Sequence, residues 1–297
     1  MKYIITGSIG HISKPLSQQL IAAGHHVTII TSNSSKVDEI RSIGAAAAVG
    51  SVEDSSFLIK TLAGADGVYL MVPPKWTVTD WFAFQKEVVD HYIAAVKANQ
   101  IKYIVALSSI GAHMRKGAGP VDGLGYLEEE LAKLTDTNVR ILRPGYFFYN
   151  LFSQIPMIKQ AGFVGSTQPA DFKLALTDTS DIAITAAADF LSGDFTGHEI
   201  KNIGSDDTHT WTEIAQILGA AIGKTDLPYV ELTDEQSRAG MLQAGLNPVI
   251  AEGYVAMGKA LRDGEMQADY WQNPPKTLGK IKLADFAQVF AGAYLAS

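Results

Sequence analysis

A glycine-rich segment near the N-terminus has the residue types and spacing that bind a phosphate group. Residues 6–13 read Thr-Gly-Ser-Ile-Gly-His-Ile-Ser, directly after a short apolar run and directly before a segment with helical periodicity. The first glycine allows a sharp turn, the second lets the backbone approach a pyrophosphate, and the N-terminus of the next helix binds the anion. A plain strand-to-helix turn with two glycines is the alternative. The pattern predicts a dinucleotide site at Gly7, Ser8, Ile9, Gly10, His11 and Ile12.

The residues after the second predicted strand bear on which dinucleotide binds. An acidic side chain there would hydrogen-bond the ribose 2′-hydroxyl of NAD and repel the 2′-phosphate of NADP. This chain has hydroxyl, amide and lysine side chains instead, and its first acid is Asp38. The usual arginine is missing, so NAD stays open as the alternative cofactor, and Lys36 could equally be a solvated surface lysine. NADP is the predicted cofactor, held at its ribose end by Thr31, Ser32, Asn33 and Lys36.

Four further stretches extend a pattern that begins with the glycine-rich segment. They are Gly50–Asp54, Met71–Pro74, Ser108–Ala112 and Leu142–Phe147 with Asn150, and Asp178–Ala183 is a weaker echo. Together they resemble the NmrA-like family of atypical, extended short-chain dehydrogenases/reductases. That family includes NAD(P)H:quinone oxidoreductases and cofactor-sensing regulators. The resemblance implies further cofactor contacts from Val72, Pro73, Pro74, Ser108, Pro144 and Tyr146.

The tyrosine and lysine that typical short-chain reductases use for proton transfer are not both present. In those enzymes a lysine four residues after the tyrosine shares its helix face and lowers its pKa, so the tyrosine acts as a general acid. Here Ser108 or Ser109 supplies the expected serine, but Glu130 stands four residues after Tyr126. Lys133 would lie about 10 Å further along the helix axis. We therefore predict that Tyr126 is not an activated acid, and the candidate catalytic residues are Tyr126, Ser109 and His113.

Aromatic residues gather where a substrate pocket is expected. Trp76 follows the fourth predicted strand, where the crevice of such a sheet opens, and could stack on a ring-shaped substrate. The aromatic run after Pro144 forms either core packing or one wall of an apolar pocket. His113 could reach a substrate or be an exposed loop histidine, and Glu128–Glu130 is expected to be a solvated helix face. No cluster of residues has the spacing of metal ligands. The predicted pocket residues are Trp76, Tyr146, Phe147 and Phe148.

Alternating strand and helix patterns position these residues. The first half predicts strands at Tyr3–Thr6, His26–Thr31, Ala46–Val49, Gly67–Val72, Tyr103–Leu107 and Val139–Leu142. Helical segments lie between them, which favours parallel βαβ units. Later strand-like segments are Lys173–Thr177 and Glu199–Ile203, and later helices lie near Ser180–Leu191, Thr212–Ile222 and Leu283–Leu295. The prediction is an α/β protein with a doubly wound parallel Rossmann sheet in residues 1–150. A smaller, mostly helical substrate domain occupies residues 151–297, of which 178–205 return to the first domain.

Composition excludes several other classes of protein. The 297 residues are 47% hydrophobic and 19% charged, which suits a large core and not a disordered chain. Cysteine is absent, so disulfides, thiolate metal sites and cysteine nucleophiles are excluded. A net charge of −7 without a dense basic run disfavours nucleic acid and anionic lipid as partners. We expect a cytoplasmic protein with no signal peptide and no membrane span.

Two classes of function fit these observations. The first is an NADP(H)-dependent reductase that passes hydride to a small electron-poor acceptor, such as a quinone. Quinones accept hydride readily and need little acid catalysis, so an incomplete tyrosine/lysine pair is compatible with activity. The second is a non-catalytic NAD(P) sensor that reports redox state to a protein partner. An isoflavone-reductase-like enzyme fits less well, because such enzymes use a lysine that has no counterpart here.

Overall fold

A seven-stranded parallel sheet forms the centre of the molecule in the computed structural model, which describes residues 1–206 and 208–297. The strand order is β11-β6-β5-β4-β1-β2-β3, and every neighbouring pair is parallel. This order, which reverses between β1 and β4, is that of a Rossmann sheet and confirms the predicted fold class. The strands are β1 (Lys2–Ile5), β2 (His26–Thr31), β3 (Ala46–Val49), β4 (Gly67–Leu70), β5 (Tyr103–Leu107), β6 (Asn138–Pro144) and β11 (His198–Ile203).

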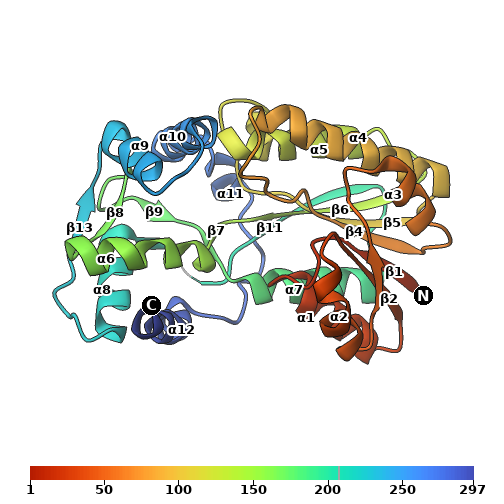
Figure 1. Ribbon diagram of the computed structural model, residues 1–297, viewed down its shortest axis with the longest axis horizontal. Coiled ribbons are helices and arrows are strands. Elements are labelled where there is room, and N and C mark those ends of the chain that lie inside the picture. The colour runs from red at the N-terminus through yellow and green to blue at the C-terminus, as the bar shows by residue number, and fades with distance from the viewer. Residues whose placement is uncertain (207) are drawn as a thin grey trace.

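Helices cover both faces of this sheet (Figure 1). One face carries α3 (Ser55–Thr61), α4 (Trp81–Asn99) and α5 (Asp122–Leu131), whose apolar side chains share a core with β4 and β5. The other face carries α1 (Ser13–Ala22), α2 (Val37–Ser42) and α7 (Thr179–Ser192). Because both faces are covered, strands such as β4 are buried at every residue, which explains their continuous apolar sequences.

Local capping residues fix where the helices begin. Asp54 accepts a hydrogen bond from the backbone N–H of Phe57 at the start of α3, as its position in the sequence predicts. Asp80 caps α4 in the same way. The side chain of Asn33 accepts a hydrogen bond from the backbone N–H of Ser35 and so caps the short 3₁₀ turn η1 (Ser34–Lys36) that leads into α2.

The second half of the chain combines short strands with helices around a second core. Three two-stranded sheets pair β10 with β7, β12 with β9 and β13 with β8. The predicted strand at 173–177 is divided into β9 and β10, because the backbone of Ala175 between them bonds to Tyr146 and to the side chain of Gln267. The strands are β7 (Tyr146–Phe147), β8 (Val164–Ser166), β9 (Lys173–Leu174), β10 (Leu176–Thr177), β12 (His209–Thr210) and β13 (Tyr229–Glu231). The helices are α6 (Ile155–Ala161), α8 (Trp211–Ala221), α9 (Asp234–Gln243), α10 (Pro248–Arg262), α11 (Ala268–Gln272) and α12 (Leu283–Ala296).

Part of this second half lies with the Rossmann sheet. Strand β11 pairs with β6 along its whole length, and α7 packs against α1. We propose on this basis a nucleotide-binding domain of residues 1–150 completed by 178–205. The remaining residues then form the smaller domain.

Two backbones approach each other closely where the smaller half contacts the larger one. Gly119 lies in the 3₁₀ turn η3 (Gly119–Val121), which packs against α10. A Cβ atom at Gly119 would overlap the carbonyl oxygen of Gly253 on α10. A Cβ atom at Gly253 would in turn lie 3.4 Å from the ring of Trp81. This contact therefore requires glycine at position 119 in η3.

We predict that Gly119→Ala destabilises the protein more than Gly117→Ala does. Both glycines have positive φ, at +56° and +92°, so alanine is strained at either position. Only at Gly119 does the new methyl group meet backbone, since no atom lies within 4 Å of a Cβ at Gly117. Overpacking of this kind costs about 1–3 kcal/mol. Urea unfolding should show that extra loss for Gly119→Ala, and equal losses for both variants would contradict the proposed contact.

Candidate cofactor and substrate site

A cavity of about 400 Å³ lies at the carboxyl ends of β1 to β4. This is the edge of the sheet where Rossmann folds bind dinucleotides. The cavity brings together six residues that the sequence predicts for the cofactor: Gly7, Ser8, Thr31, Ser32, Pro73 and Pro74. Its other lining residues were not predicted as site residues, and they are Ile30, Gly50, Ser51, Val52, Glu53, Met71, Lys75, Phe84 and Tyr92. Ser51 to Glu53 follow β3, just as Ser32 follows β2. Their position at the carboxyl end of a predicted strand could therefore have identified them as site residues from the sequence.

The glycine-rich turn has the backbone geometry that its sequence predicts. Gly7 has φ of +89°, and a Cβ atom there would lie 2.7 Å from the Oγ of Ser13. Ser13 occupies the position where related motifs often have a third glycine. Its hydroxyl donates a 2.8 Å hydrogen bond to the carbonyl oxygen of Thr6, which ties the first turn of α1 to the end of β1. A small side chain with one hydroxyl therefore keeps helix and strand close.

The N-terminus of α1 is arranged to receive an anion. Ile12 occupies the cap position, and no side chain of the described residues caps this helix. The backbone N–H of Lys14 already donates to the carbonyl oxygen of Gly10, and Pro15 has no N–H. The start of α1 therefore offers a pyrophosphate mainly the positive end of the helix dipole. A Cβ atom at Gly10 would lie 3.1 Å from the carbonyl oxygen of Gly7, so a larger residue would crowd this position.

Hydroxyl groups connect the turn to the end of β2. The Oγ of Ser8 donates a 2.9 Å hydrogen bond to the Oγ1 of Thr31, and the backbone N–H of Asn33 donates to the same oxygen. Lys36 forms a 3.2 Å ion pair with Glu39. The residues predicted to hold the adenine ribose therefore lie on one connected segment beside the cavity.

The serine at the end of β5 is committed to a buried ion-pair network. The Oγ of Ser108 donates a 2.5 Å hydrogen bond to Glu128, whose side chain is only 3% exposed. Arg143 is 4% exposed and bonds to the same carboxylate and, at 2.8 Å, to Asp269 on α11. The expectation that Glu128 belongs to a solvated helix face is wrong, because Arg143 compensates its charge in the interior. Asn202 also donates to Asp269, and hydrogen bonds from Asn202 and Arg143 hold the pKa of that carboxyl below its usual range despite burial.

Tyr126 is held away from the glycine-rich turn. Its hydroxyl donates a 2.7 Å hydrogen bond to Asp90 on α4, and it does not line the cavity. Burial and this hydrogen bond raise the pKa of Tyr126, which is the opposite of what an activated general acid needs. Lys86 pairs with Asp90 and lies over the tyrosine ring, while Glu130 pairs with Lys133. Lys86 by itself lowers the pKa of Tyr126, but burial and the hydrogen bond to Asp90 outweigh this effect, so the tyrosine is not activated as in short-chain reductases.

The two candidate histidines lie in different surroundings. His11 is exposed in the glycine-rich turn, and its ring centroid lies 4.2 Å from that of Tyr149. His113 is partly buried in the 3₁₀ turn Ala112–Met114, which follows β5 and Ser109. Its Nδ1 is buried without a hydrogen-bond partner in the described part of the chain. His113 is therefore the candidate with an unused polar atom.

Three aromatic rings meet where the loop after β4 contacts α10. Trp76 is 49% exposed, and its ring centroid lies 6.0 Å from Tyr254 and 5.8 Å from Trp81. Trp81 and Tyr254 are 5.7 Å apart and nearly perpendicular. Burial raises the pKa of Tyr254 to about 12, so its hydroxyl stays protonated at neutral pH. Of these three residues the sequence pointed only to Trp76, because Tyr254 lies far away along the chain.

The aromatic run after Pro144 serves mainly as packing. Phe148 is fully buried against Phe286, at a ring distance of 5.5 Å, so the structure places it in the second core and not at a pocket wall. Tyr146 packs edge-on against Trp211 in the same core. Phe147 packs against the other face, with the α1 and α7 side of the sheet. Alternation along β7 directs neighbouring side chains to different cores.

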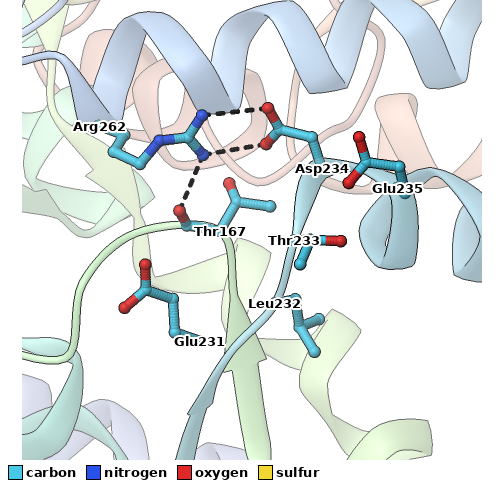
Figure 2. A pocket seen from close by; sticks show the side chains of 7 residues that line it. All are labelled: Thr167, Glu231, Leu232, Thr233, Asp234, Glu235 and Arg262. Carbon is cyan, nitrogen blue, oxygen red and sulfur yellow. Dashed lines mark hydrogen bonds and ion pairs between the residues drawn. The ribbon is translucent and has the colours of Figure 1, made fainter.

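A second cavity of about 340 Å³ lies where β13, α9 and α10 meet (Figures 1 and 2). Figure 2 shows Arg262 held by both carboxylate oxygens of Asp234, at 2.9 and 3.0 Å, and by the carbonyl oxygen of Thr167. None of the residues predicted from the sequence lines this cavity. The guanidinium of Arg262 already has hydrogen-bond partners in Asp234 and Thr167.

Within residues 1–206 and 208–297, no three His, Asp or Glu side chains come together as metal ligands. No helix of those residues has both the length and the apolar character needed to cross a bilayer.

A protein-family model describes the part of the chain that forms the cavity. Residues 7–149 match the model of the NAD(P)H-binding family. No match was found among curated proteins. The matched segment contains all the predicted cofactor residues and every residue that lines the 400 Å³ cavity.

Solved structures share the fold over almost the whole chain. NADPH-dependent quinone oxidoreductase QOR2 from Escherichia coli, complexed with NADPH, gives a TM-score of 0.81 at 20% identity, covering 97% of this chain and 99% of its own. Triphenylmethane reductase from Citrobacter sp., complexed with NADP(H), gives 0.79 at 19% identity, covering 97% and 100%. A nucleoside-diphosphate-sugar epimerase from Staphylococcus aureus gives 0.76 at 19%, covering 97% and 100%. The likeness confirms the predicted Rossmann fold and its helical C-terminal region.

We predict that Arg143→Met destabilises the protein by about 3–5 kcal/mol, because it leaves the buried carboxylate of Glu128 without its close cation and also removes the partner of Asp269, which is 23% exposed. Arg262→Met is the matched control. Its partner Asp234 is a third exposed, and such pairs contribute about 1 kcal/mol or less. Chemical unfolding of both variants measures the difference. Equal, small losses would show that the buried network contributes little to stability.

Proposed function

We propose that the protein is an NADPH-dependent reductase that transfers hydride to a small, planar, electron-poor acceptor such as a quinone. The observation that carries this proposal is that Tyr126 and Ser108, one of the two candidate serines, are both hydrogen-bonded to structural partners. Ser108 bonds to buried Glu128, and Tyr126 bonds to Asp90 with its pKa raised. An acceptor that needs little acid catalysis suits such a site better than a ketone or an alcohol.

The choice of NADPH over NADH rests on the end of β2. Thr31, Ser32 and Lys36 supply hydroxyls and a positive charge, and the first carboxylate in this segment is Asp38. The quinone oxidoreductase and the triphenylmethane reductase that share the fold were both solved with the phosphorylated cofactor. These observations support a site built for the 2′-phosphate.

Bound NADPH would supply a hydride, that is, two electrons and one proton, from its nicotinamide ring. The residues of this chain then have two tasks. The glycine-rich turn and the start of α1 would hold the pyrophosphate. The aromatic cluster of Trp76, Trp81 and Tyr254 would give a flat acceptor an apolar surface on which to stack. The second proton that completes the hydroquinone would come from water, since Tyr126 is not tuned to give it.

A cofactor sensor is the second candidate. The same commitment of Ser108 and Tyr126 favours it, because a protein that only binds NAD(P) needs no proton donor. Such a sensor would bind the cofactor, leave quinones unreduced and act through a protein partner. Turnover decides between the two functions.

The first test combines cofactor binding with turnover. Wild-type protein should bind NADPH and oxidise it in the presence of a panel of quinones. Gly10→Asp should abolish both, because it places bulk and negative charge against the pyrophosphate at a position only 3.1 Å from backbone. Gly240→Asp, on α9 with open space around it, is the control and should behave as wild type. Binding without turnover would favour the sensor, and NADPH binding by Gly10→Asp would refute the site itself.

The second test concerns Tyr126. If its hydroxyl serves only Asp90, Tyr126→Phe should lower kcat with a quinone by less than about tenfold, whereas loss of a true general acid costs about 10²–10⁴. Trp76→Ala should act mainly on KM, because its exposed ring would contact the substrate. A thousandfold loss in Tyr126→Phe with normal NADPH affinity would restore the standard short-chain reductase mechanism.

A further inference from the structure

One carboxylate joins two lysines beside the end of β2. Glu39, on α2, bonds through one oxygen to the Nζ of Lys14 and through the other to the Nζ of Lys36, each at 3.2 Å. Lys14 comes from the first turn of α1, and Lys36 comes from the 3₁₀ turn η1. The three side chains come from separate elements, and each is between about two fifths and one half exposed.

This triad adjoins both parts of the proposed cofactor site. The backbone N–H of Lys14 donates to the carbonyl oxygen of Gly10, which places Lys14 one turn beyond the glycine-rich segment. Lys36 follows Thr31 and Ser32, two residues that line the cavity. The Ser8–Thr31 hydrogen bond holds the glycine-rich turn against the end of β2. The two ammonium groups therefore lie together near the place proposed for the adenine ribose.

The charge balance of the triad favours a second anion. Two lysines and one glutamate leave one positive charge, while Asp38 and Arg41, also on α2, cancel each other. Hydrogen bonds first from Lys14 and then from Lys36 lower the pKa of Glu39, so this carboxylate is ionised at neutral pH. A phosphate monoester carries about −1.5 to −2 charges and three acceptor oxygens. It would therefore bind two adjacent ammonium groups more strongly than one carboxylate does.

We propose that Lys14 and Lys36 together bind the 2′-phosphate of NADPH and that Glu39 competes with this phosphate for both lysines. The proposal rests on the proposed NADPH site and adds two residues to it. Lys14 is a second phosphate ligand, and Glu39 limits the preference for the phosphorylated cofactor. Lys14 lies 22 positions before Lys36 in the sequence, so only the fold brings the two lysines to one carboxylate.

The experiment measures Kd for NADPH and for NADH by calorimetry, at low salt, in the full-length protein. Lys14→Ala and Lys36→Ala should each weaken NADPH binding about tenfold, the lower end of a charge-assisted contact, and leave NADH binding unchanged. Glu39→Gln should strengthen NADPH binding about two- to fivefold, the range of an exposed ion pair, again without effect on NADH. Lys259→Ala removes a comparable exposed lysine, paired with Asp263 on α10, and should change neither value.

Adenosine 2′-monophosphate separates this inference from the reductase function. This probe carries the phosphate without the nicotinamide, so its binding should follow the same order of variants even if the protein reduces no quinone. Added salt should reduce the ratio of NADPH affinity to NADH affinity more in wild type than in Lys14→Ala. The variant has one lysine fewer near the phosphate, so salt has less attraction to screen.

The outcomes are distinguishable. If wild type binds NADPH more tightly than NADH while Lys14→Ala behaves like Lys259→Ala, Lys14 is not a phosphate ligand and the inference fails alone. If Glu39→Gln weakens NADPH binding, the carboxylate positions the lysines for the phosphate and does not compete with it, which also overturns the inference. Equal affinity of wild type for both cofactors would overturn the NADPH assignment and the inference together.

Discussion

Arg143 stands at the carboxyl end of β6, and its buried guanidinium bonds to Glu128 on α5 and to Asp269 on α11. Three segments that lie far apart in the sequence thus meet at one cation. Removing the Glu128 carboxylate and the Arg143 guanidinium from water is costly, and the arrangement is tolerable because the charges and hydrogen bonds compensate one another. Ser108 and Asn202 add hydrogen bonds to Glu128 and Asp269, respectively. The carboxyl edge of the sheet and the C-terminal helices are therefore fixed to each other at the level of the site.

This network also determines what chemistry the site can perform. Ser108 occupies the position of a proton-transfer serine, but its hydroxyl is directed to Glu128 in the interior. Tyr126, two residues before Glu128 on the same helix, points to Asp90 on the neighbouring helix. Ser108 and Tyr126 thus contribute to packing and cohesion in this structure. In the proposed function, the phosphate-binding turn, the cavity and the aromatic surface would serve hydride transfer to an acceptor that is already reactive.

The features that the sequence predicted well are those with a local cause. Gly7, Gly10 and the flanking strand and helix act within a dozen residues, so their spacing alone indicated the turn. The cap at Asp54 is local in the same way, because its side chain accepts from the backbone N–H of Phe57, three residues further along. The features that were missed depend on partners far along the chain. Glu128 was predicted to be solvated because no local sequence pattern indicates that Arg143 is its partner. Tyr254 contacts Trp76 only because α10 packs against the loop after β4. Phe148 was ambiguous until the second core was known.

One edge of the sheet is formed by β11, which is the last of its seven strands to be synthesised. β11 is synthesised about fifty residues after β6, yet it pairs with β6 along its whole length. Until then, the emerging chain presents β6 as a bare edge whose residues are almost all destined for burial. Such an edge pairs readily with other chains. A fragment that stops near residue 150 would therefore keep every phosphate-binding residue and still be prone to aggregate. The smallest fragment in which this edge of β6 is covered therefore extends at least through β11.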